Sequence, residues 1–564
     1  MKKTGAQILC ESLVREGVDV IFGISGGTVI PLYDAFSEYP QIRRVLVRHE
    51  QAAAHAAAGY ARATHRAGVC VATSGPGATN LVTGIADAYM DSTPMVVITG
   101  QVARQFIGKD AFQECDITGI TLPIIKHNYL VREAKDIARI VKEAFHIAQT
   151  GRPGPVLIDL PKDVQTEFAE FEYPDSVYLP GYRPVTEPDP AQVANVAGLL
   201  NRAERPVIIA GRGVNISRAF EELRELAETI QAPVVHTLLG LGSLPPQHHL
   251  DLGMLGMHGQ TAANLAVQNA DLVLAVGTRL GDRATMRTGD FAPRAIVVHI
   301  DIDPAELGKN VAPFASLVGD AKVTLRRLNA LVAPAERTEW LAQVRLWRAT
   351  NPLVPATRSP RLSARTVIRQ VCRTAGHRTV MVTGVGQHQM FAAQEYASPR
   401  LNGFISSGGL GTMGFELPAA LGAQIACPDD DVWVVAGDGG FQMTMQELST
   451  AVQERLPIKI AVISNGYLGM VRQWQSLFQK GNYVDVALHT PDFVKLADAY
   501  GIPAVRVERE EDVASAIERA RSHPGLFLID FVVDPDENVY PMVAPGESLD
   551  CMLQAPAMAA TVAS

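Results

Sequence analysis

The sequence predicts an α/β protein built from three doubly wound parallel-sheet domains. Short runs rich in valine and isoleucine, such as residues 44–48, 68–74 and 94–100, alternate with alanine-rich stretches of helical periodicity. Strands that alternate with helices predict parallel sheets that are covered on both faces. Several of these runs are followed by glycine-rich turns, drawn from 47 glycines in the chain, which favours the same class.

A short internal repeat indicates that the first and last domains are similar. Residues 153–160 (PGPVLIDL) match residues 524–531 (PGLFLIDF) at Pro, Gly, Leu, Ile and Asp, and both copies follow an amphipathic helical stretch. A match this short also arises by chance, because the buried last strand of any such domain has a similar composition. The simplest organisation places two similar units on either side of a third.

Two connectors rich in proline and charged residues divide the chain. They span residues 172–192 and 347–364 and are typical of domain boundaries. We therefore predict domains at residues 1–175, 190–340 and 365–550. The length of 564 residues is sufficient for several large apolar cores.

The start of the chain predicts a helix rather than a signal peptide. Thr4 and Gln7 have the spacing of a capping box, an apolar stripe follows, and Gly17 suits the C-terminal cap. Two lysines precede this stretch, but no apolar block of the signal-peptide kind follows them. We expect the folded domain to begin at once.

The composition argues against several classes of protein. Lys and Arg number 50 against 59 Asp and Glu, a net charge of −9 without long runs of either sign, so we expect no nucleic-acid or membrane partner. The six cysteines are scattered without a CxxC pair, which favours a reduced, cytoplasmic chain over a disulfide framework or zinc site. No apolar run is long enough to predict a transmembrane helix.

Two polar side chains stand at the ends of successive predicted strands in the third domain. The run DDVWVVAGDGGF ends in Gly437, Asp438, Gly439 and Gly440, and the run PIKIAVISNG ends at Asn465. Glycines let backbone N–H groups approach a phosphate, and oxygen ligands from two strand ends suit Mg²⁺. Either residue alone would more often be a capping or turn residue. Together, at this spacing, they favour a metal–diphosphate site.

A second glycine motif favours a different class of enzyme. Residues 409–414 (GLGTMG) satisfy the pattern G-x-G-x-x-G, and Asp438 follows at about the distance that an NAD-dependent dehydrogenase requires. A single match of this pattern is weak evidence. It would also leave Gly439, Gly440 and Asn465 without a role.

The Gly-Asp-Gly and asparagine pair resembles the diphosphate signature of thiamine diphosphate (ThDP) enzymes, although Ser464 replaces the first of the usual two asparagines. The resemblance implies that Asp438, Asn465 and the carbonyl of Tyr467 hold Mg²⁺. It also requires a glutamate from another domain that promotes loss of the cofactor's C2 proton, and Glu50 at a predicted strand-to-helix junction matches it. A glutamate at a helix start is common for electrostatic reasons alone.

Further segments, among them GKDAFQE, GVGQHQM, SGGLGTMG and MVRQWQ, resemble the catalytic subunits of acetohydroxyacid (acetolactate) synthases over roughly residues 4–553. The resemblance implies a transferase that decarboxylates pyruvate and joins the product to a second pyruvate or to 2-oxobutyrate, yielding 2-acetolactate or 2-aceto-2-hydroxybutyrate for the synthesis of branched-chain amino acids. It also implies a homodimer or dimer of dimers, the cofactors ThDP, Mg²⁺ and FAD, and a separate small regulatory subunit.

The resemblance assigns roles to matching positions. Glu50 is the catalytic acid. The ThDP contacts are Gly386, Gln387, His388, Gly411, Met413, Gly437, Asp438, Gly439, Gly440, Asn465 and Tyr467. The FAD contacts are Arg212, Gly213, Met257, His258, Gly277, Arg279, Asp301, Ile302 and Asp320. The substrate contacts are Gly27, Phe112, Gln113 and Lys126 from the opposite subunit, together with Arg283 and Trp474.

Some positions depart from the family pattern. Leu280 and Gly281 replace Phe and Asp, Ser25 replaces Pro, and Glu416 replaces Gly. The choice of acceptor substrate and the affinity for FAD therefore stay open. So do three alternatives: another ThDP-dependent carboligase, a 2-oxoacid decarboxylase or oxidase, and a catalytically silent partner of a true synthase.

Overall fold

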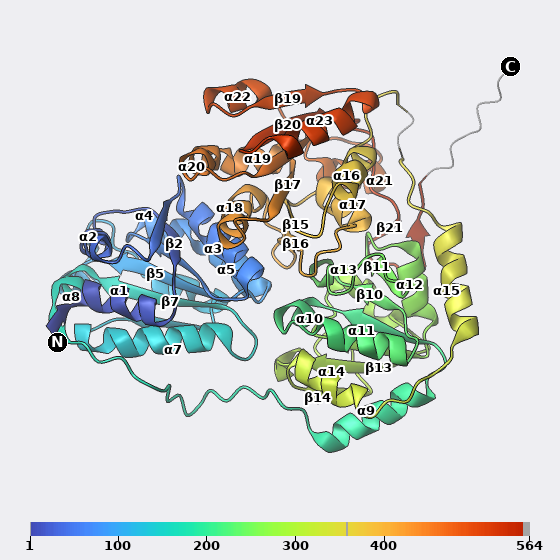
Figure 1. The fold of residues 1–564 in the computed structure, drawn as a ribbon, viewed down its shortest axis with the longest axis horizontal. Coiled ribbons are helices and arrows are strands. Elements are labelled where there is room, and N and C mark those ends of the chain that lie inside the picture. The colour runs from blue at the N-terminus through green and yellow to red at the C-terminus, as the bar shows by residue number, and fades with distance from the viewer. Residues whose placement is uncertain (1, 357–358, 556–564) are drawn as a thin grey trace.

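The computed structural model describes residues 2–356 and 359–555 and contains three six-stranded parallel sheets with helices on their faces (Figure 1). The strands of the first sheet are β2 (Val20–Gly23), β3 (Arg43–Leu46), β4 (Gly68–Ala72), β5 (Met95–Gln101), β6 (His127–Leu130) and β7 (Pro155–Pro161). Its helices are α1 (Gly5–Arg15), α2 (Ile30–Ala35), α3 (Glu50–Thr64), α4 (Pro76–Asn80), α5 (Val82–Met90), α6 (Ile117–Thr121), α7 (Ile137–Gln149) and α8 (Lys162–Thr166). Short strands β1 (Lys2–Thr4) and β8 (Phe168–Glu170) pair beside them.

The middle sheet consists of β9 (Pro206–Ala210), β10 (Val234–His236), β11 (Asp251–Met254), β12 (Leu272–Val276), β13 (Ile296–Asp301) and β14 (Ala315–Val318). Its helices are α9 (Pro190–Arg202), α10 (Arg212–Ile216), α11 (Phe220–Thr229), α12 (Thr261–Asn269), α13 (Asp282–Thr285), α14 (Ala321–Asn329) and α15 (Thr338–Thr350). The strand order, β11-β10-β9-β12-β13-β14, is that of dinucleotide-binding folds.

The third sheet consists of β15 (Thr379–Thr383), β16 (Phe404–Ser406), β17 (Asp431–Gly437), β18 (Lys459–Ser464), β19 (Ala504–Val507) and β20 (Phe527–Val532). Its helices are α16 (Ala364–Arg373), α17 (Gln387–Glu395), α18 (Glu416–Ala426), α19 (Asp438–Thr444), the 3-10 turn η8 (Met445–Glu447), α20 (Leu448–Gln453), α21 (Gly469–Phe478), α22 (Phe493–Ala499) and α23 (Glu510–Ser522). Strands β21 (Met542–Val543) and β22 (Met552–Leu553) pair near the end of the described chain.

The first and third sheets have the same topology, which confirms the similarity that the repeat predicted. Their orders are β3-β2-β4-β5-β7-β6 and β16-β15-β17-β18-β20-β19, so the strands correspond one to one along the chain. The two copies of the repeat lie in β7 and β20. Each is the last strand of its sheet along the chain and stands fifth in the spatial order.

The capping box at the start of the chain is also confirmed. The Gln7 N–H donates to Thr4 Oγ1 at 3.3 Å and the Thr4 N–H donates to Gln7 Oε1 at 3.1 Å. Helix α1 ends at Arg15, and Gly17 follows its C-cap with φ +74°.

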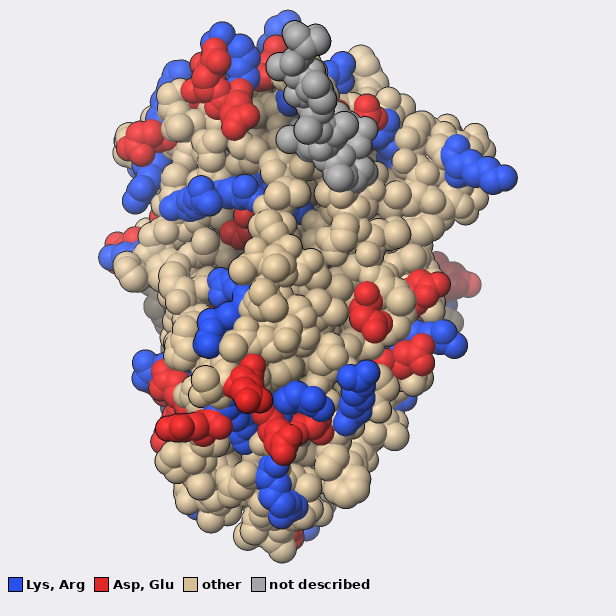
Figure 2. Space-filling model, turned by 90° about the vertical axis from the view of Figure 1, so that its right-hand side faces the viewer, with Lys and Arg blue, Asp and Glu red and all other residues tan. Residues whose placement is uncertain are grey.

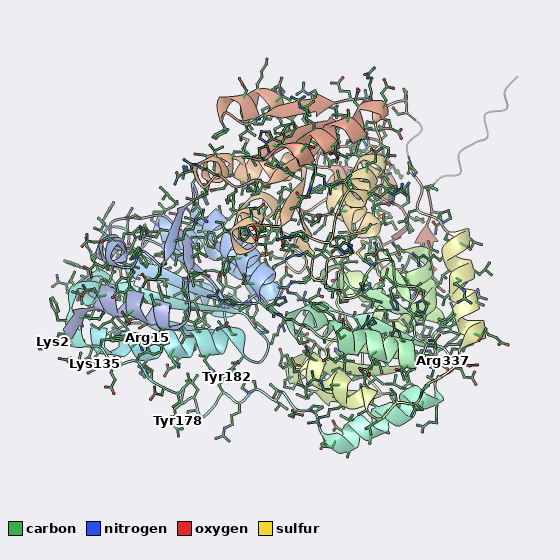
Figure 3. All side chains as sticks on the ribbon, in the orientation of Figure 1. Lys2, Arg15, Lys135, Tyr178, Tyr182 and Arg337 are labelled. Carbon is green, nitrogen blue, oxygen red and sulfur yellow. The ribbon has the colours of Figure 1, made fainter. Side chains whose placement is uncertain are left out.

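The domain limits stay a prediction, although helix α15 crosses one of them. It continues to Thr350, ten residues past the expected limit at 340, because its Trp340 and Val344 are buried with the apolar cluster of the middle domain. Residues 171–189, after β8, form neither helix nor strand, and Figure 3 shows Tyr178 and Tyr182 on this segment.

The first and third domains meet through two helices that approach each other very closely. Gly59 of α3 and Gly422 of α18 lie at the contact, where an added Cβ would come within 2.0 Å of Ala419 O and 1.8 Å of Ala56 O. The alanine-rich sequence of α3 is therefore explained by a contact that has no room for larger side chains.

One face of the molecule carries charged side chains of both signs. On the face in Figure 2, lysine and arginine are interspersed with aspartate and glutamate without a single-sign stripe. Within residues 2–356 and 359–555, no helix is long and apolar enough to cross a membrane.

Candidate active site

The fold brings the two expected metal-binding strand ends together. Strands β17 and β18 are neighbours, with Gly437 opposite Ile463. Asp438 Oδ2 accepts a hydrogen bond from the Gly466 N–H at 2.7 Å, and Asn465 Oδ1 accepts one from the Tyr467 N–H at 2.9 Å. Both side chains therefore bind the backbone of one turn, residues 465–467.

A small cavity of about 70 Å³ opens over this turn. It is lined by Gly386, Gln387, His388, Met413, the Gly437–Gly440 turn, Asn465 and Tyr467, together with neighbouring residues. All of the expected ThDP contacts except Gly411 are thus around one space.

The groups around the small cavity fit a metal-bound diphosphate. Burial lowers the pKa of His388 to about 3, so the imidazole is neutral, and its buried Nε2 has no hydrogen-bond partner in the described chain. Burial raises the pKa of the Asp438 carboxyl to about 6, and it forms no ion pair with any described residue. A buried carboxyl without a countercharge and an unpartnered nitrogen are relieved when a cation and a phosphate occupy the space.

No group of three or more His, Cys, Asp or Glu side chains that could bind a metal occurs in the part of the chain that the structure describes. The expected site does not need one, because it combines one carboxylate with an amide oxygen and a backbone carbonyl. Such oxygen sets bind Mg²⁺ when phosphates and water complete the coordination.

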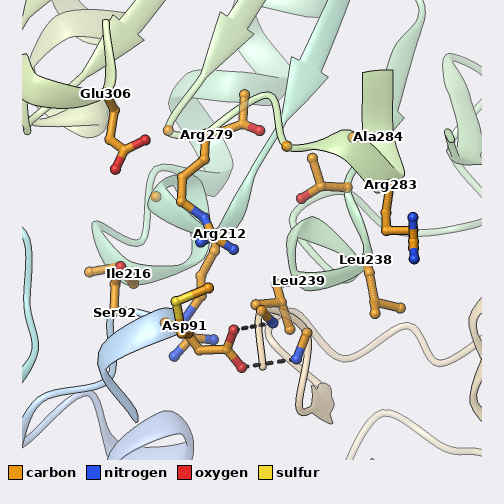
Figure 4. Close-up of a pocket in the computed structure, with 18 of the residues that line it drawn as sticks. Asp91, Ser92, Arg212, Ile216, Leu238, Leu239, Arg279, Arg283, Ala284 and Glu306 are labelled. Atoms are coloured by element: carbon orange, nitrogen blue, oxygen red, sulfur yellow. Dashed lines mark hydrogen bonds between the residues drawn. The ribbon is translucent and has the colours of Figure 1, made fainter. Parts of the chain in front are cut away.

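A much larger cavity, of about 1490 Å³, lies where the three domains meet (Figure 4). Arg212 and Arg279 extend into it from the middle domain. The expected FAD contacts all line it: Arg212, Gly213, Met257, His258, Gly277, Arg279, Asp301, Ile302 and Asp320.

The local structure of the large cavity fits a nucleotide. Strands β9, β12 and β13 are adjacent, and the turns after them bring Gly213 against Gly277, where an added Cβ would lie 2.6 Å from the facing Cα. The buried Nε of Arg212 has no hydrogen-bond partner among the described residues, and burial lowers the pKa of Arg212 to about 9. A phosphate beside this guanidinium would satisfy it.

The GLGTMG segment forms a loop between β16 and α18 that the first domain anchors. Asp91 accepts hydrogen bonds from the N–H groups of Gly408 (3.0 Å) and Gly409 (2.6 Å), drawn dashed in Figure 4. Arg62 in turn donates to Asp91 at 2.8 Å. Sequence reasoning missed Asp91 and Arg62, since nothing in their local pattern indicates a contact with a distant loop. The loop carries Gly411 and Met413, which line the large cavity.

Family models match the chain in three parts. Residues 3–120 match the N-terminal TPP binding domain of thiamine pyrophosphate enzymes, residues 193–328 their central domain, and residues 384–531 their C-terminal TPP binding domain. An acetolactate synthase large subunit of Mycobacterium tuberculosis is 52% identical over 97% of this chain and 91% of its own. Those of Corynebacterium glutamicum (97% and 89% covered) and Cyanidium caldarium (98% and 97%) are 48% and 47% identical.

This chain belongs to the acetolactate synthase family. The resemblance predicted from its motifs is confirmed, as is the three-domain ThDP-enzyme fold.

In this member of the acetolactate synthase family, the two residues expected to hold the second substrate contact each other at the wall of the large cavity. Arg283 belongs to α13 of the middle domain and Trp474 to α21 of the third domain, and the Arg283 Cζ lies 5.9 Å from the centre of the Trp474 ring. Both line the cavity.

Five expected site residues line neither cavity of their own chain: Glu50, Gly27, Phe112, Gln113 and Lys126. Glu50 opens α3 and accepts a hydrogen bond from Asn80 Nδ2 at 2.9 Å. Phe112 is 89% exposed. Lys126 is bound within the first domain, where its Nζ donates to Thr150 O at 2.8 Å and Tyr182 Oη at 2.9 Å.

Proposed function

We propose that this chain decarboxylates pyruvate and joins the resulting two-carbon unit to a second pyruvate or to 2-oxobutyrate. The products are 2-acetolactate and 2-aceto-2-hydroxybutyrate, precursors of branched-chain amino acids. The supporting observation is that the two cavities share part of their walls: Val385, Gly386, Met413, Met470 and Val471. A cofactor held at the Gly437–Gly440 turn would therefore adjoin the space that Arg283 and Trp474 line.

ThDP, when bound, supplies the carbanion chemistry for both steps. The protein holds it at one end, where Asp438, Asn465 and the Tyr467 carbonyl bind Mg²⁺ and the His388 imidazole contacts the diphosphate. Met413, at the wall that the two cavities share, would pack against the bound cofactor. Most of these groups are placed by a strand end or a helix start, which gives a rigid support.

Glu50 holds a proton at the aminopyrimidine ring and serves the cavity of a second copy of the chain. Two observations support this arrangement. Glu50 lines neither cavity of its own chain. The first domain also exposes large apolar side chains that a dimer interface would cover, including Phe106, Phe112 and Leu122. The working unit is thus a homodimer or a dimer of dimers.

Arg283 and Trp474 hold the acceptor substrate. A guanidinium binds a 2-oxoacid carboxylate through charge-assisted hydrogen bonds, and the indole packs against the methyl or ethyl group of the acceptor. FAD occupies the large cavity with a structural role, bound through Arg212, Asp301 and the other expected contacts.

A separate small subunit regulates the enzyme in the cytoplasm. Several relatives are named large subunits, which supports a small one. The six unpaired cysteines support a reducing compartment.

The deciding experiment is product analysis by mass spectrometry with ThDP, Mg²⁺, FAD, pyruvate and 2-oxobutyrate. Acetolactate and acetohydroxybutyrate, strongly reduced in Glu50→Gln, are expected. Acetaldehyde or acetate as the main product would instead identify a decarboxylase or oxidase, and equal activity in Glu50→Gln would remove Glu50 from the mechanism.

A further inference from the structure

A buried glutamate of the third domain binds the backbone that leads into Glu50. Glu447 is the last residue of η8 and is fully buried. Its Oε1 accepts hydrogen bonds from the N–H groups of Arg48 (2.9 Å) and His49 (3.1 Å). Glu50 follows as the first residue of α3, so these bonds fix the turn that carries it.

Further contacts hold both sides of this link. Thr450 Oγ1 donates to Glu447 Oε2 at 2.7 Å, so both carboxylate oxygens are bound. The Arg48 guanidinium donates to Ser449 Oγ (2.9 Å) and Gln453 Oε1 (2.8 Å) of α20. In Figure 1, α20 lies at the boundary between the first and third domains. The turn before Glu50 is therefore attached to the third domain by backbone and side chain alike.

No other acceptor for the Arg48 and His49 N–H groups occurs in the described chain. N–H groups at a helix start have no partner within the helix, and leaving buried ones unpaired is costly. Loss of the Glu447 carboxylate would consequently release the turn, and the Glu50 side chain would keep the hydrogen bond from Asn80 but not the fixed backbone beneath it.

The segment that holds Glu447 begins at the metal site. Asp438 opens α19, which ends at Thr444, and η8 starts at the next residue. Asp438 and Glu447 are therefore joined by two short helical pieces that follow each other directly, with the backbone outside the helical region at Thr444 (φ −137°, ψ 14°).

We propose that Glu447 is a positioning residue for Glu50 of its own chain, and that it links the metal site of one active centre to the acid of the other. The inference rests on the proposed function, in which Glu50 serves the cavity of the partner copy. Each chain then carries half of two sites, and Glu447 is the connection between the halves.

The first test measures the acid's effect on the cofactor without substrate. In Glu447→Ala, exchange of the C2 proton of bound ThDP for deuterium, followed by NMR after acid quenching, should slow by at least about tenfold, the equivalent of one lost charge-assisted hydrogen bond. In Glu447→Gln the amide oxygen still accepts, so most of the rate should return. ThDP affinity should stay within about twofold of the parent in both variants, because the site is held by other residues.

The matched control is Glu454→Gln, which removes the ion pair between Glu454 and Arg43 (2.7 Å) at the same domain boundary but leaves the turn intact. It should exchange at the parent rate. If Glu447→Ala exchanged the C2 proton at the parental rate, the inference would be overturned. It would also be overturned if Glu454→Gln slowed the exchange as much as Glu447→Ala does.

Mixed dimers, in which two differently tagged chains are co-purified, separate this inference from the proposed function. A Glu50→Gln chain paired with an Asp438→Asn chain leaves one site intact, so the proposed function predicts roughly half of the parental activity. A failure to recover activity in this pair would contradict the shared-site arrangement.

A Glu50→Gln chain paired with a Glu447→Ala chain gives the opposite expectation. One site carries the Glu50→Gln substitution, and the other has a Glu50 that its own chain no longer positions. The mixed dimer should therefore be no more active than the Glu50→Gln and Glu447→Ala homodimers. Recovery to half of the parental activity would mean that Glu447 serves the metal site of its own chain, and would refute the inference.

Discussion

The guanidinium of Arg283 lies over the indole of Trp474, with Cζ 5.9 Å from the ring centre. The two residues come from different domains, so the contact depends on how the middle and third domains are packed. It brings a cation and a flat apolar surface to one point of the cavity wall, an arrangement that suits a molecule with a carboxylate at one end and a short alkyl group at the other.

Replacement of Arg283 should act on the second substrate rather than the first. In Arg283→Gln, we expect the KM of the acceptor to rise by about tenfold or more, since a charge-assisted hydrogen bond is lost, and acetaldehyde to increase among the products. The measurement is product ratio against 2-oxobutyrate concentration. Arg287→Gln is the control, because Arg287 pairs with Asp290 at 3.2 Å and lines neither cavity. An unchanged product ratio in Arg283→Gln would contradict the assignment.

Replacement of Asp438 should weaken binding of ThDP and Mg²⁺ without unfolding the chain. In Asp438→Asn the amide oxygen still accepts bonds from the Gly439 or Gly466 N–H groups, while the charge that faces the metal is lost. We expect the affinity for ThDP with Mg²⁺, measured by calorimetry, to fall at least about tenfold. The exposed Asp429 supplies the control Asp429→Asn, which should bind like the parent.

The sequence predicted what is set locally. The capping box of Thr4 and Gln7, the strand ends at Asp438 and Asn465, and the repeat in β7 and β20 each lie within a short window, and the structure places them as expected. Patterns of this length report on periodicity and turns, which are properties of neighbouring residues.

Contacts between distant segments could not be predicted in this way. Asp91 binds the loop at Gly408, and Glu447 binds the turn at His49, across more than 300 residues of chain. Neither partner's local sequence indicates the other, because each side chain is compatible with an ordinary surface position. Helix α15, which continues to Thr350, also depends on such packing, because its Trp340 and Val344 are buried in the apolar cluster of the middle domain.

Glu416 should make the stability of the third domain fall as the pH rises. Burial raises the pKa of its carboxyl from 4.5 to about 7, because it outweighs what the nearby backbone N–H groups of Gly414 and Glu416 contribute in the opposite direction. Between these two values the folded protein keeps a proton that the unfolded chain releases, so the free energy of unfolding decreases with increasing pH through this window. The contribution lost is about 3 kcal/mol, at about 1.4 kcal/mol for each pKa unit.

The variant Glu416→Gln cannot ionise and should lose this dependence. Relative to the parent, its stability in urea unfolding should improve between pH 5 and pH 8, because only the parent is penalised at the higher pH. The exposed Glu510 provides the control Glu510→Gln. A difference between Glu416→Gln and parent that is the same at both pH values would show that the carboxyl ionises normally.

The contact between α3 and α18 reverses the usual effect of a glycine-to-alanine change. In an exposed helix, alanine is favoured over glycine by about 1 kcal/mol. At Gly59, however, the new methyl group would lie 2.0 Å from the Ala419 carbonyl oxygen, a backbone atom that cannot rotate away. We expect Gly59→Ala to lower the free energy of unfolding by about 1–3 kcal/mol, as overpacking of a core does.

Gly198 in α9 is the matched control, since its Cβ would meet only the end of the Arg202 side chain at 3.5 Å. Gly198→Ala should therefore stabilise the protein. Urea unfolding of both variants measures the two signs, and stabilisation by Gly59→Ala would mean that the two helices are farther apart than described.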